Sequence, residues 1–210
     1  AQGMARATGK PAVCIASSGP GATNLLTAIA DAKLDSIPIV AITGQVPKAM
    51  IGTDAFQEVD TYGLSIPITK HNFLVSSAEE LLEVIPRAFT LAASGRPGPV
   101  LVDIPKDVQN QRIEVKEWPA PGLPEPAPAF DVAAIDQALA MIERAERPIL
   151  YLGGGVVHSG AADLAVALAE KASLPTVMTL MALGAMPVDH PLSLGMLGMH
   201  GARCTNLALD

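Results

Sequence analysis

Residues 50–60, which read MIGTDAFQEVD, form the part of the chain whose side chains are best suited to chemistry. The run follows residues 42–47, which read as the end of a buried strand, and open α/β sheets bind ligands at the carboxyl ends of their strands. Gln57 can donate and accept hydrogen bonds at once, which suits a substrate carboxylate or carbonyl, and Phe56 offers a flat apolar wall. The residues alone allow a surface loop with one buried anchor equally well.

A second candidate is the turn SGPGATN, which contains Ser18, Gly19 and Asn24 and lies between a predicted strand and a predicted helix. Its glycines allow close backbone approach, and the helix start offers free N–H groups to an anion. The turn matches neither the dinucleotide fingerprint nor the P-loop. Taken alone, it is more simply a structural turn.

Lys106 follows another predicted strand, so it belongs at the same edge of the sheet, where its ammonium could bind a carboxylate as a point charge. A solvated loop lysine is the simpler interpretation. The glycines Gly153, Gly154 and Gly155 clear side chains from a further strand end, where a cofactor could lie or the chain could simply turn.

Methionine is concentrated near the end of the chain, where five of the eight residues fall between Met178 and Met199. They could line a cofactor or, more simply, fill a core. His200 has glycines close on both sides, which favours an exposed or ligand-adjacent imidazole. The other three histidines lack metal-type spacing, so no metal site is predicted.

The bulk composition narrows the class of protein. Of 210 residues, 50% are hydrophobic, 17% charged and 3% aromatic, which suits an aliphatic α/β core. The net charge of −7 argues against a nucleic-acid partner, and no apolar run is long enough for a membrane span. Cys14 and Cys204 are expected to be reduced thiols of a cytosolic protein.

Strand and helix signals alternate along the chain. Strands are expected at 11–16, 37–43, 68–75, 100–104, 148–152 and 176–180, and helices at 22–34, 76–93, from Asp131, and 161–171. Two overlapping capping boxes, Ser76 with Glu79 and Ser77 with Glu80, mark the second helix, which Pro86 should kink or weaken. Five prolines between 118 and 128 predict an extended linker. We therefore predict two parallel-sheet α/β units, Rossmann-like or flavodoxin-like.

Three segments together resemble acetolactate synthase, also called acetohydroxyacid synthase, a thiamine diphosphate-dependent family. They are SGPGATN, the run from Ile42 to Asp60, and RPGPVLVDIPKD from Arg96 to Asp107. The resemblance covers essentially the whole chain and is greatest to large catalytic subunits of the bacterial catabolite type. It implies a pyrimidine-binding domain over 1–114, a linker over 115–130 and the first part of a central, FAD-binding domain over 131–210.

The resemblance also assigns roles to residues. Phe56 and Gln57 would reach the active site from a neighbouring subunit, and Lys106 would line the substrate channel. The flavin contacts would come from Arg96, Gly153, Gly154, Gly155, Thr179, Leu180 and Met181, with Met199 and His200 beside the flavin, and Ser18, Gly19 and Asn24 are added here as cofactor-binding candidates. The family's herbicides contact the same channel.

The reaction implied is the decarboxylation of pyruvate on thiamine diphosphate and condensation with pyruvate or 2-ketobutyrate, in branched-chain amino-acid biosynthesis. The family's catalytic glutamate would lie just before Ala1, and the diphosphate and Mg²⁺ site in a later domain. The chain is thus expected to be an internal fragment, inactive alone. The parent is expected to be a cytoplasmic bacterial homodimer or homotetramer with a plausible small regulatory subunit.

Two alternatives remain open at this point. The chain could come from a sister thiamine diphosphate enzyme, such as a pyruvate oxidase or a glyoxylate carboligase. It could also act as a non-catalytic binding module. The run from Gly52 to Glu58 favours acetolactate synthase over the sister enzymes.

Overall fold

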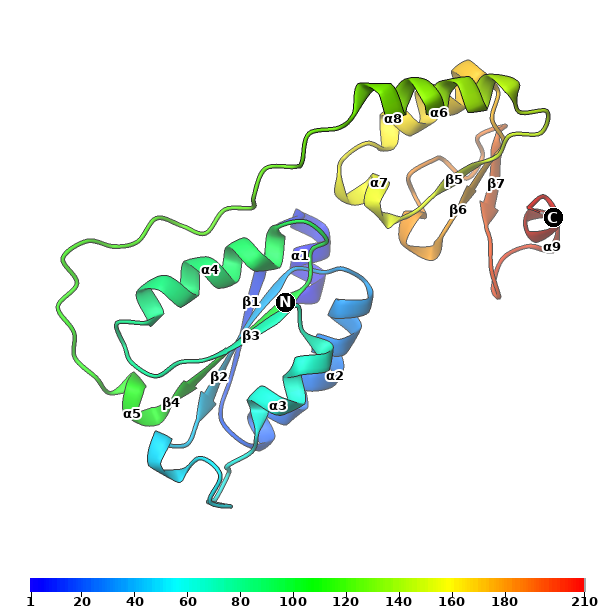
Figure 1. Ribbon diagram of the computed structural model, residues 1–210. Coiled ribbons are helices and arrows are strands. Elements are labelled where there is room, and N and C mark those ends of the chain that lie inside the picture. Colours follow the sequence, from blue (N-terminus) through cyan, green and yellow to red (C-terminus); the bar gives the residue numbers. More distant parts are fainter. Residues whose placement is uncertain (210) are drawn as a thin grey trace. The chain divides into compact units, whose positions relative to one another are not determined.

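The computed structural model describes residues 1–209 and divides into two compact units, one of residues 1–128 and one that begins at Ala129 (Figure 1). Each unit is built on its own parallel β-sheet. The predicted α/β class with two parallel-sheet units is therefore confirmed. Among the described residues, no helix combines the length and apolar character that crossing a membrane requires.

The first unit contains a four-stranded sheet in the order β1-β2-β4-β3, with every neighbouring pair parallel. Its strands are β1 (Ala12–Ala16), β2 (Ile39–Gln45), β3 (His71–Leu74) and β4 (Pro99–Pro105). The central strands β2 and β4 are buried on both faces, which explains their continuous runs of aliphatic residues. In their register Thr43 stands opposite Asp103, a pairing that becomes important at the site.

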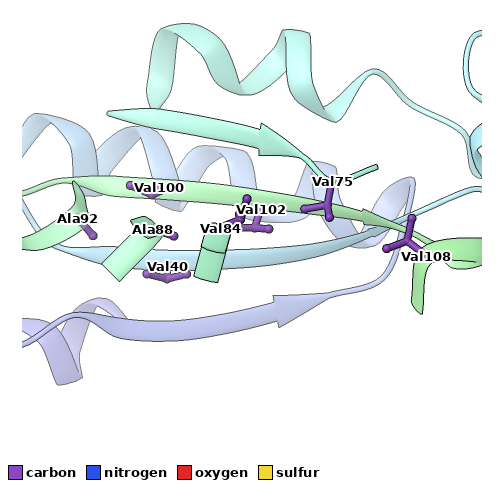
Figure 2. Packing of buried hydrophobic residues seen from close by; sticks show 8 residues of the cluster. All are labelled: Val40, Val75, Val84, Ala88, Ala92, Val100, Val102 and Val108. Carbon is purple, nitrogen blue, oxygen red and sulfur yellow. The ribbon is translucent and has the colours of Figure 1, made fainter. Parts of the chain in front are cut away.

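Helices cover both faces of this sheet (Figure 1). Alternate residues of each strand point to opposite faces, so Val100 and Val102 pack against α4 (Figure 2), while Leu101 packs with Ile29 of α2. The helices of this unit are α1 (Gln2–Thr8), α2 (Pro20–Leu34), α3 (Thr61–Ser65), α4 (Leu81–Ala93) and α5 (Lys106–Gln109), with short 3₁₀ turns at Lys48–Met50 and Ile66–Ile68.

The start of α4 differs from the expectation of a helix from residue 76. The Glu80 carboxylate accepts bonds from the backbone N–H and the hydroxyl of Ser76, at 2.6 and 2.7 Å, and the Glu80 N–H donates to the Ser77 hydroxyl. These bonds hold residues 76–80 in a turn, so the helix begins only at Leu81. Pro86 lies inside α4, which continues as one helix to Ala93.

The proline-rich segment after α5 is extended, as predicted, but it is attached to the first unit. The backbone N–H of Glu125 donates to the Ser94 hydroxyl at 2.8 Å, just past the end of α4. Residues 118–122 and side chains of α4, among them Leu81 and Phe89, line a common apolar groove. The segment therefore packs on α4 before the second unit begins.

The second unit has a three-stranded parallel sheet in the order β5-β6-β7. Its strands are β5 (Leu150–Leu152), β6 (Thr176–Met178) and β7 (Ser193–Met196), and its helices are α6 (Val132–Arg144), α7 (Gly154–His158), α8 (Ala162–Ala172) and α9 (Arg203–Leu207), with a 3₁₀ turn at Leu180–Ala182. Asp131 caps α6 as predicted, since its carboxylate accepts from the Ala133 N–H at 2.9 Å. Neither β7 nor α9 was predicted from the sequence.

Candidate functional site

The first unit has a cavity at the carboxyl edge of its sheet. The ends of β1, β2 and β4 surround about 600 Å³, and the polar lining includes Ser18, Gln45, Lys106 and Gln109. The structure thus brings together Ser18 and Lys106, which lie far apart in sequence. Lys106 is the first residue of α5, directly after β4, as the position of the strand end predicted.

The loop carrying Phe56 and Gln57 lies against the turn that carries Ser18 and Gly19. A Cβ atom at Gly19 would lie 2.8 Å from the Gln57 carbonyl oxygen and 2.9 Å from its Cα, so only glycine permits this approach. Gly19 also has a φ of 57°, which is strained for other residues. The two sequence motifs therefore meet, and the contact joins their backbones.

Gln57 itself has a φ of 60°, which is uncommon for a residue other than glycine. Such backbone conformations persist where the surroundings enforce them, and they are concentrated at functional sites. The Gln57 side chain is exposed, and Phe56 is 88% exposed, so neither side chain is used in the core of this unit. Phe56 is therefore not the buried loop anchor that the simpler interpretation required.

Below the cavity lies a buried polar cluster that the sequence analysis did not select. The Asp103 carboxylate accepts from the Thr43 hydroxyl at 2.7 Å and from the Gln45 side-chain N–H at 3.0 Å. Burial raises the pKa of Asp103 to about 6, against the two hydrogen bonds, and the nearby Asp60 charge adds to the rise. The sequence contained a signal for this cluster, namely an aspartate inside the otherwise apolar strand PVLVDIP. Burying a carboxyl group is costly unless it has hydrogen-bond partners.

The start of the loop is fixed to the chain around it. The Lys48 backbone N–H donates to the Asp107 carboxylate at 2.9 Å, and the Lys48 ammonium donates to the Ser76 carbonyl at 2.7 Å. Asp107 follows Lys106 in α5. The same short helix therefore lines the cavity and holds the loop that borders it.

Two predicted cofactor contacts lie away from this cavity. Asn24 is exposed on α2 and lines a different hollow, together with Gln2 and Cys14. Arg96 precedes β4, at the opposite edge of the sheet, where its guanidinium donates to the Ser36 hydroxyl at 2.7 Å and the Leu34 carbonyl at 3.0 Å. The structure does not bring these two residues together with Ser18 and Gly19, and their cofactor roles remain predictions.

In the second unit, the predicted glycine turn meets the segment after β6. A Cβ atom at Gly154 would lie 2.9 Å from the Met181 Cβ, and the Thr179 N–H donates to the Leu152 carbonyl at 3.0 Å. The turn is not a flexible connection, because Gly154 and Gly155 begin α7, with Gly153 as its N-cap. The carboxyl ends of β5 and β6 thus form a compact backbone surface.

This surface contains an unpaired hydroxyl. Thr179 Oγ1 is buried and has no hydrogen-bond partner among the described residues. A buried hydroxyl without a partner is costly, which makes Thr179 a candidate for contact with a ligand or a water molecule. Leu180, the next residue, is 69% exposed and could cover such a group.

Met199 and His200 follow β7, and both side chains are exposed, as predicted for His200. Asn206 holds their loop, since its side chain accepts from the Gly198 N–H at 2.8 Å and donates to the Gly198 carbonyl at 3.0 Å. Met178 and Met186 are instead buried in the core of the second unit. The methionine concentration thus mixes core residues with exposed ones. No cluster of His, Cys, Asp or Glu suited to a metal occurs among residues 1–209.

Two family models match the chain. One is described as "Thiamine pyrophosphate enzyme, N-terminal TPP binding domain" and matches residues 1–64. The other is described as "Thiamine pyrophosphate enzyme, central domain" and matches residues 135–210. The first contains the Gly19 turn and the Phe56–Gln57 loop, and the second contains the glycine turn and residues 179–181.

Curated relatives match the chain from end to end. "Acetolactate synthase isozyme 1 large subunit" of Escherichia coli is 66% identical over 210 residues, which is all of this chain and 37% of that protein. "Acetolactate synthase 1, chloroplastic" of rice (Oryza sativa subsp. japonica) is 53% identical over 218 residues, which is 33% of its length. "Probable acetolactate synthase large subunit" of Methanocaldococcus jannaschii is 49% identical over 214 residues, which is 36% of its length. The chain thus spans about a third of the length of these relatives.

Proposed function

Because this chain belongs to the thiamine pyrophosphate enzymes, whose N-terminal and central domains it contains in part, we propose that its parent protein is the catalytic large subunit of an acetolactate synthase. The parent would decarboxylate pyruvate and join the remaining two-carbon unit to a second 2-keto acid, either pyruvate or 2-ketobutyrate. The observation that carries this proposal is the 66% identity to an acetolactate synthase large subunit along the whole chain.

The geometry of the first unit supports specific roles in that reaction. Gln57 has an exposed amide on the loop whose backbone lies against Gly19, the neighbour of the cavity-lining Ser18, and this amide can hold a keto-acid carboxylate or carbonyl. Lys106 lines the same cavity and supplies a positive charge for a carboxylate. Phe56 projects from its loop, which suits a contact with a neighbouring subunit. Bound thiamine diphosphate would supply the electron sink for decarboxylation.

Two features of the second unit support a flavin site. Gly153, Gly154 and Gly155 leave the carboxyl ends of the strands free of side chains, and the buried Thr179 hydroxyl has no partner among residues 1–209. Such an edge can approach a nucleotide closely. We propose that these residues hold FAD with Leu180 and Met181, beside Met199 and His200, and that Arg96 contributes a flavin contact as the resemblance implies. Asn24 stays a cofactor candidate with Ser18 and Gly19.

The rest of the assembly is proposed by analogy with the relatives. The parent would be a homodimer or homotetramer with its active site at a subunit interface, accompanied by a small subunit, and located in the cytoplasm. The Mg²⁺ that binds the diphosphate would be held by residues outside this chain.

Acetolactate formation from pyruvate by the full-length protein, with and without thiamine diphosphate and Mg²⁺, tests this function. Acetolactate that depends on the cofactor supports the proposal. Cofactor-dependent loss of carbon dioxide without acetolactate would identify a sister enzyme and remove the acceptor roles of Gln57 and Lys106. No turnover of any 2-keto acid would favour a binding module.

A further inference from the structure

The Gln45 side chain connects the two ends of the loop that carries Phe56 and Gln57. Its Nε2 donates to the Val59 carbonyl at 2.8 Å, and its Oε1 accepts from the Val46 N–H at 2.9 Å. The first and last residues of the 46–59 loop therefore both bond to one side chain, that of Gln45 at the end of β2. This closed form is that of a compact Ω-type loop, and such loops are frequently functional.

Asp103 fixes the orientation of that side chain. The second Nε2 hydrogen of Gln45 is donated to Asp103 Oδ2 at 3.0 Å. If the amide were reversed, its oxygen would face two acceptors, the Val59 carbonyl and the Asp103 carboxylate. The observed orientation is thus the one that satisfies every polar atom of the buried Gln45 amide.

Asp103 is fully buried, so it cannot touch a substrate in the cavity above it. None of the ion pairs found among the described residues includes it. Its two oxygens are instead held by the Thr43 hydroxyl and the Gln45 amide. A buried carboxyl group without a cation is costly, and one of its two hydrogen bonds, that with Gln45, belongs to the loop closure.

The loop has few other attachments to the body of the unit. Lys48 bonds to Asp107 and to the Ser76 carbonyl near its start, and the Gln57 backbone lies against Gly19. The remaining bonds near its tip are internal, as between the Gly52 N–H and the Glu58 carboxylate at 3.3 Å. The Gln45 closure is therefore the contact that joins both ends of the loop.

We propose that Asp103 is a positioning residue that acts through Gln45 to hold the loop of residues 46–59 closed, and so places Phe56 and Gln57 against the Ser18–Gly19 turn. The structural part of this inference concerns the loop alone. Its consequence for turnover rests on the proposed function.

Hydrogen exchange of the full-length protein, followed by mass spectrometry, tests the structural part. Gln45→Met removes the amide at similar length. Asp103→Asn replaces a carboxylate, a charged acceptor, with a neutral amide, which weakens the bond that Gln45 donates. Thr43→Val is the matched control, because it removes the other bond to Asp103 and keeps the Gln45 closure. If Gln45→Met does not fold, Gln45→Asn shortens the amide by one methylene and takes its place.

Amides of residues 46–59 should exchange more than about tenfold faster in Gln45→Met, which loses three hydrogen bonds, and up to about tenfold faster in Asp103→Asn, which weakens one. They should exchange at the wild-type rate in Thr43→Val. In the double variant, Asp103→Asn should add nothing to Gln45→Met, because it acts through that side chain. Additive effects, an unchanged loop in the single variants, or equal loosening in the control would each overturn the proposal.

Kinetics separate this inference from the proposed function. With acetolactate formation as the assay, Gln45→Met and Asp103→Asn should lower kcat/KM about tenfold, in proportion to the loosened closure, while Thr43→Val should retain it. Loop loosening in a protein that makes no acetolactate would sustain the inference and refute the function. If the loop is loosened but kcat/KM for acetolactate formation is unchanged, the inference is refuted and the proposed function stands.

Discussion

At the scale of single residues, the first unit separates side chains that can meet a substrate from those that hold them in place. Lys106 lines the carboxyl-edge cavity and Gln57 is exposed on the neighbouring loop. Thr43, Gln45 and Asp103 are buried, although the first two also form part of the cavity lining. Substitution of Gln57 or Lys106 should affect turnover, because little packing depends on these exposed side chains. Substitution of the three buried residues should also affect stability and the order of the loop.

Gln57→Ala in the full-length protein should lower kcat/KM with pyruvate by tenfold or more, on the order of one lost hydrogen bond to a charged group. Its side chain is exposed, so the melting temperature should stay close to wild type. Gln137→Ala, an exposed glutamine on α6, is the matched control and should alter neither quantity. Wild-type kinetics in Gln57→Ala would remove its substrate role.

The raised pKa of Asp103 predicts a dependence of stability on pH. Its pKa is about 6 in the folded protein against 3.8 for an ordinary aspartate, so between these values the folded state binds more protons than the unfolded state. The contribution of Asp103 to the free energy of unfolding is therefore greatest at low pH and falls as pH rises from about 4 to about 6, by about 3 kcal/mol in total.

Asp103→Asn cannot ionise, so its stability relative to wild type should rise by about 3 kcal/mol between pH 4 and pH 7. Chemical unfolding of the full-length protein across that range measures the difference. Parallel stability profiles for the two proteins would show that the folded pKa of Asp103 is ordinary. The stability of Thr43→Val should still depend on pH, because this variant retains the Asp103 carboxyl group.

At the scale of elements, both sheets present their candidate residues in the same way. The turn after β1 and the loop after β2 meet at Gly19, and the segments after β5 and β6 meet at Gly154. Parallel strands place these connections at one edge because each strand ends there. Glycine is needed at each meeting point because a side chain would separate the two segments.

The contact of Gly154 with Met181 can be tested by comparing alanine substitutions at Gly154 and Gly155. Gly154→Ala places a methyl group 2.9 Å from the Met181 Cβ, whereas a Cβ at Gly155 has nothing within 4 Å. Gly154→Ala should lower stability by about 1–3 kcal/mol through overpacking. It should also displace the 179–181 segment and reduce the flavin content of the purified full-length protein.

Gly155→Ala should retain both stability and flavin. Flavin absorbance per protein, together with chemical unfolding, measures the pair. Equal flavin content in the two variants would separate the Gly154–Met181 contact from flavin binding.

At the scale of the whole molecule, the two units divide the proposed cofactors. The first carries the candidate residues for the keto acid and the thiamine diphosphate, and the second carries most of the flavin candidates. Arg96 is an exception to this division, because it belongs to the first unit and its guanidinium bonds the end of α2. Its flavin role is therefore the assignment most in need of a direct test.

Arg96→Ala in the full-length protein should lower FAD retention if the resemblance assigns the residue correctly, since a guanidinium is well suited to a phosphate or carbonyl beside a nucleotide. Ser36→Ala is the matched control, because it removes only the acceptor of one Arg96 hydrogen bond. If Arg96→Ala and Ser36→Ala both lose flavin, or both retain it, the role of Arg96 is limited to stabilising the connection between α2 and β2. Flavin titration by fluorescence gives the dissociation constants.

The sequence by itself determined the α/β class, nearly all of the strands and longer helices, and the capping of α6 by Asp131, because these follow from local periodicity and end signals. It also placed Lys106 directly after a strand, and Phe56 and Gln57 in the loop that follows another strand. It missed β7 and α9, which are short, and it began α4 too early because Glu80 bonds back to Ser76.

Only the tertiary structure decided which candidates meet. The contact of Gly19 with Gln57 and the bonds of Asp103 to Thr43 and Gln45 join residues separated by 38 to 60 positions, so no local pattern reveals them. Local sequence patterns also do not reveal that Arg96 and Asn24 lie away from the cavity. Strand order and register set these neighbours, and both depend on packing across the whole sheet.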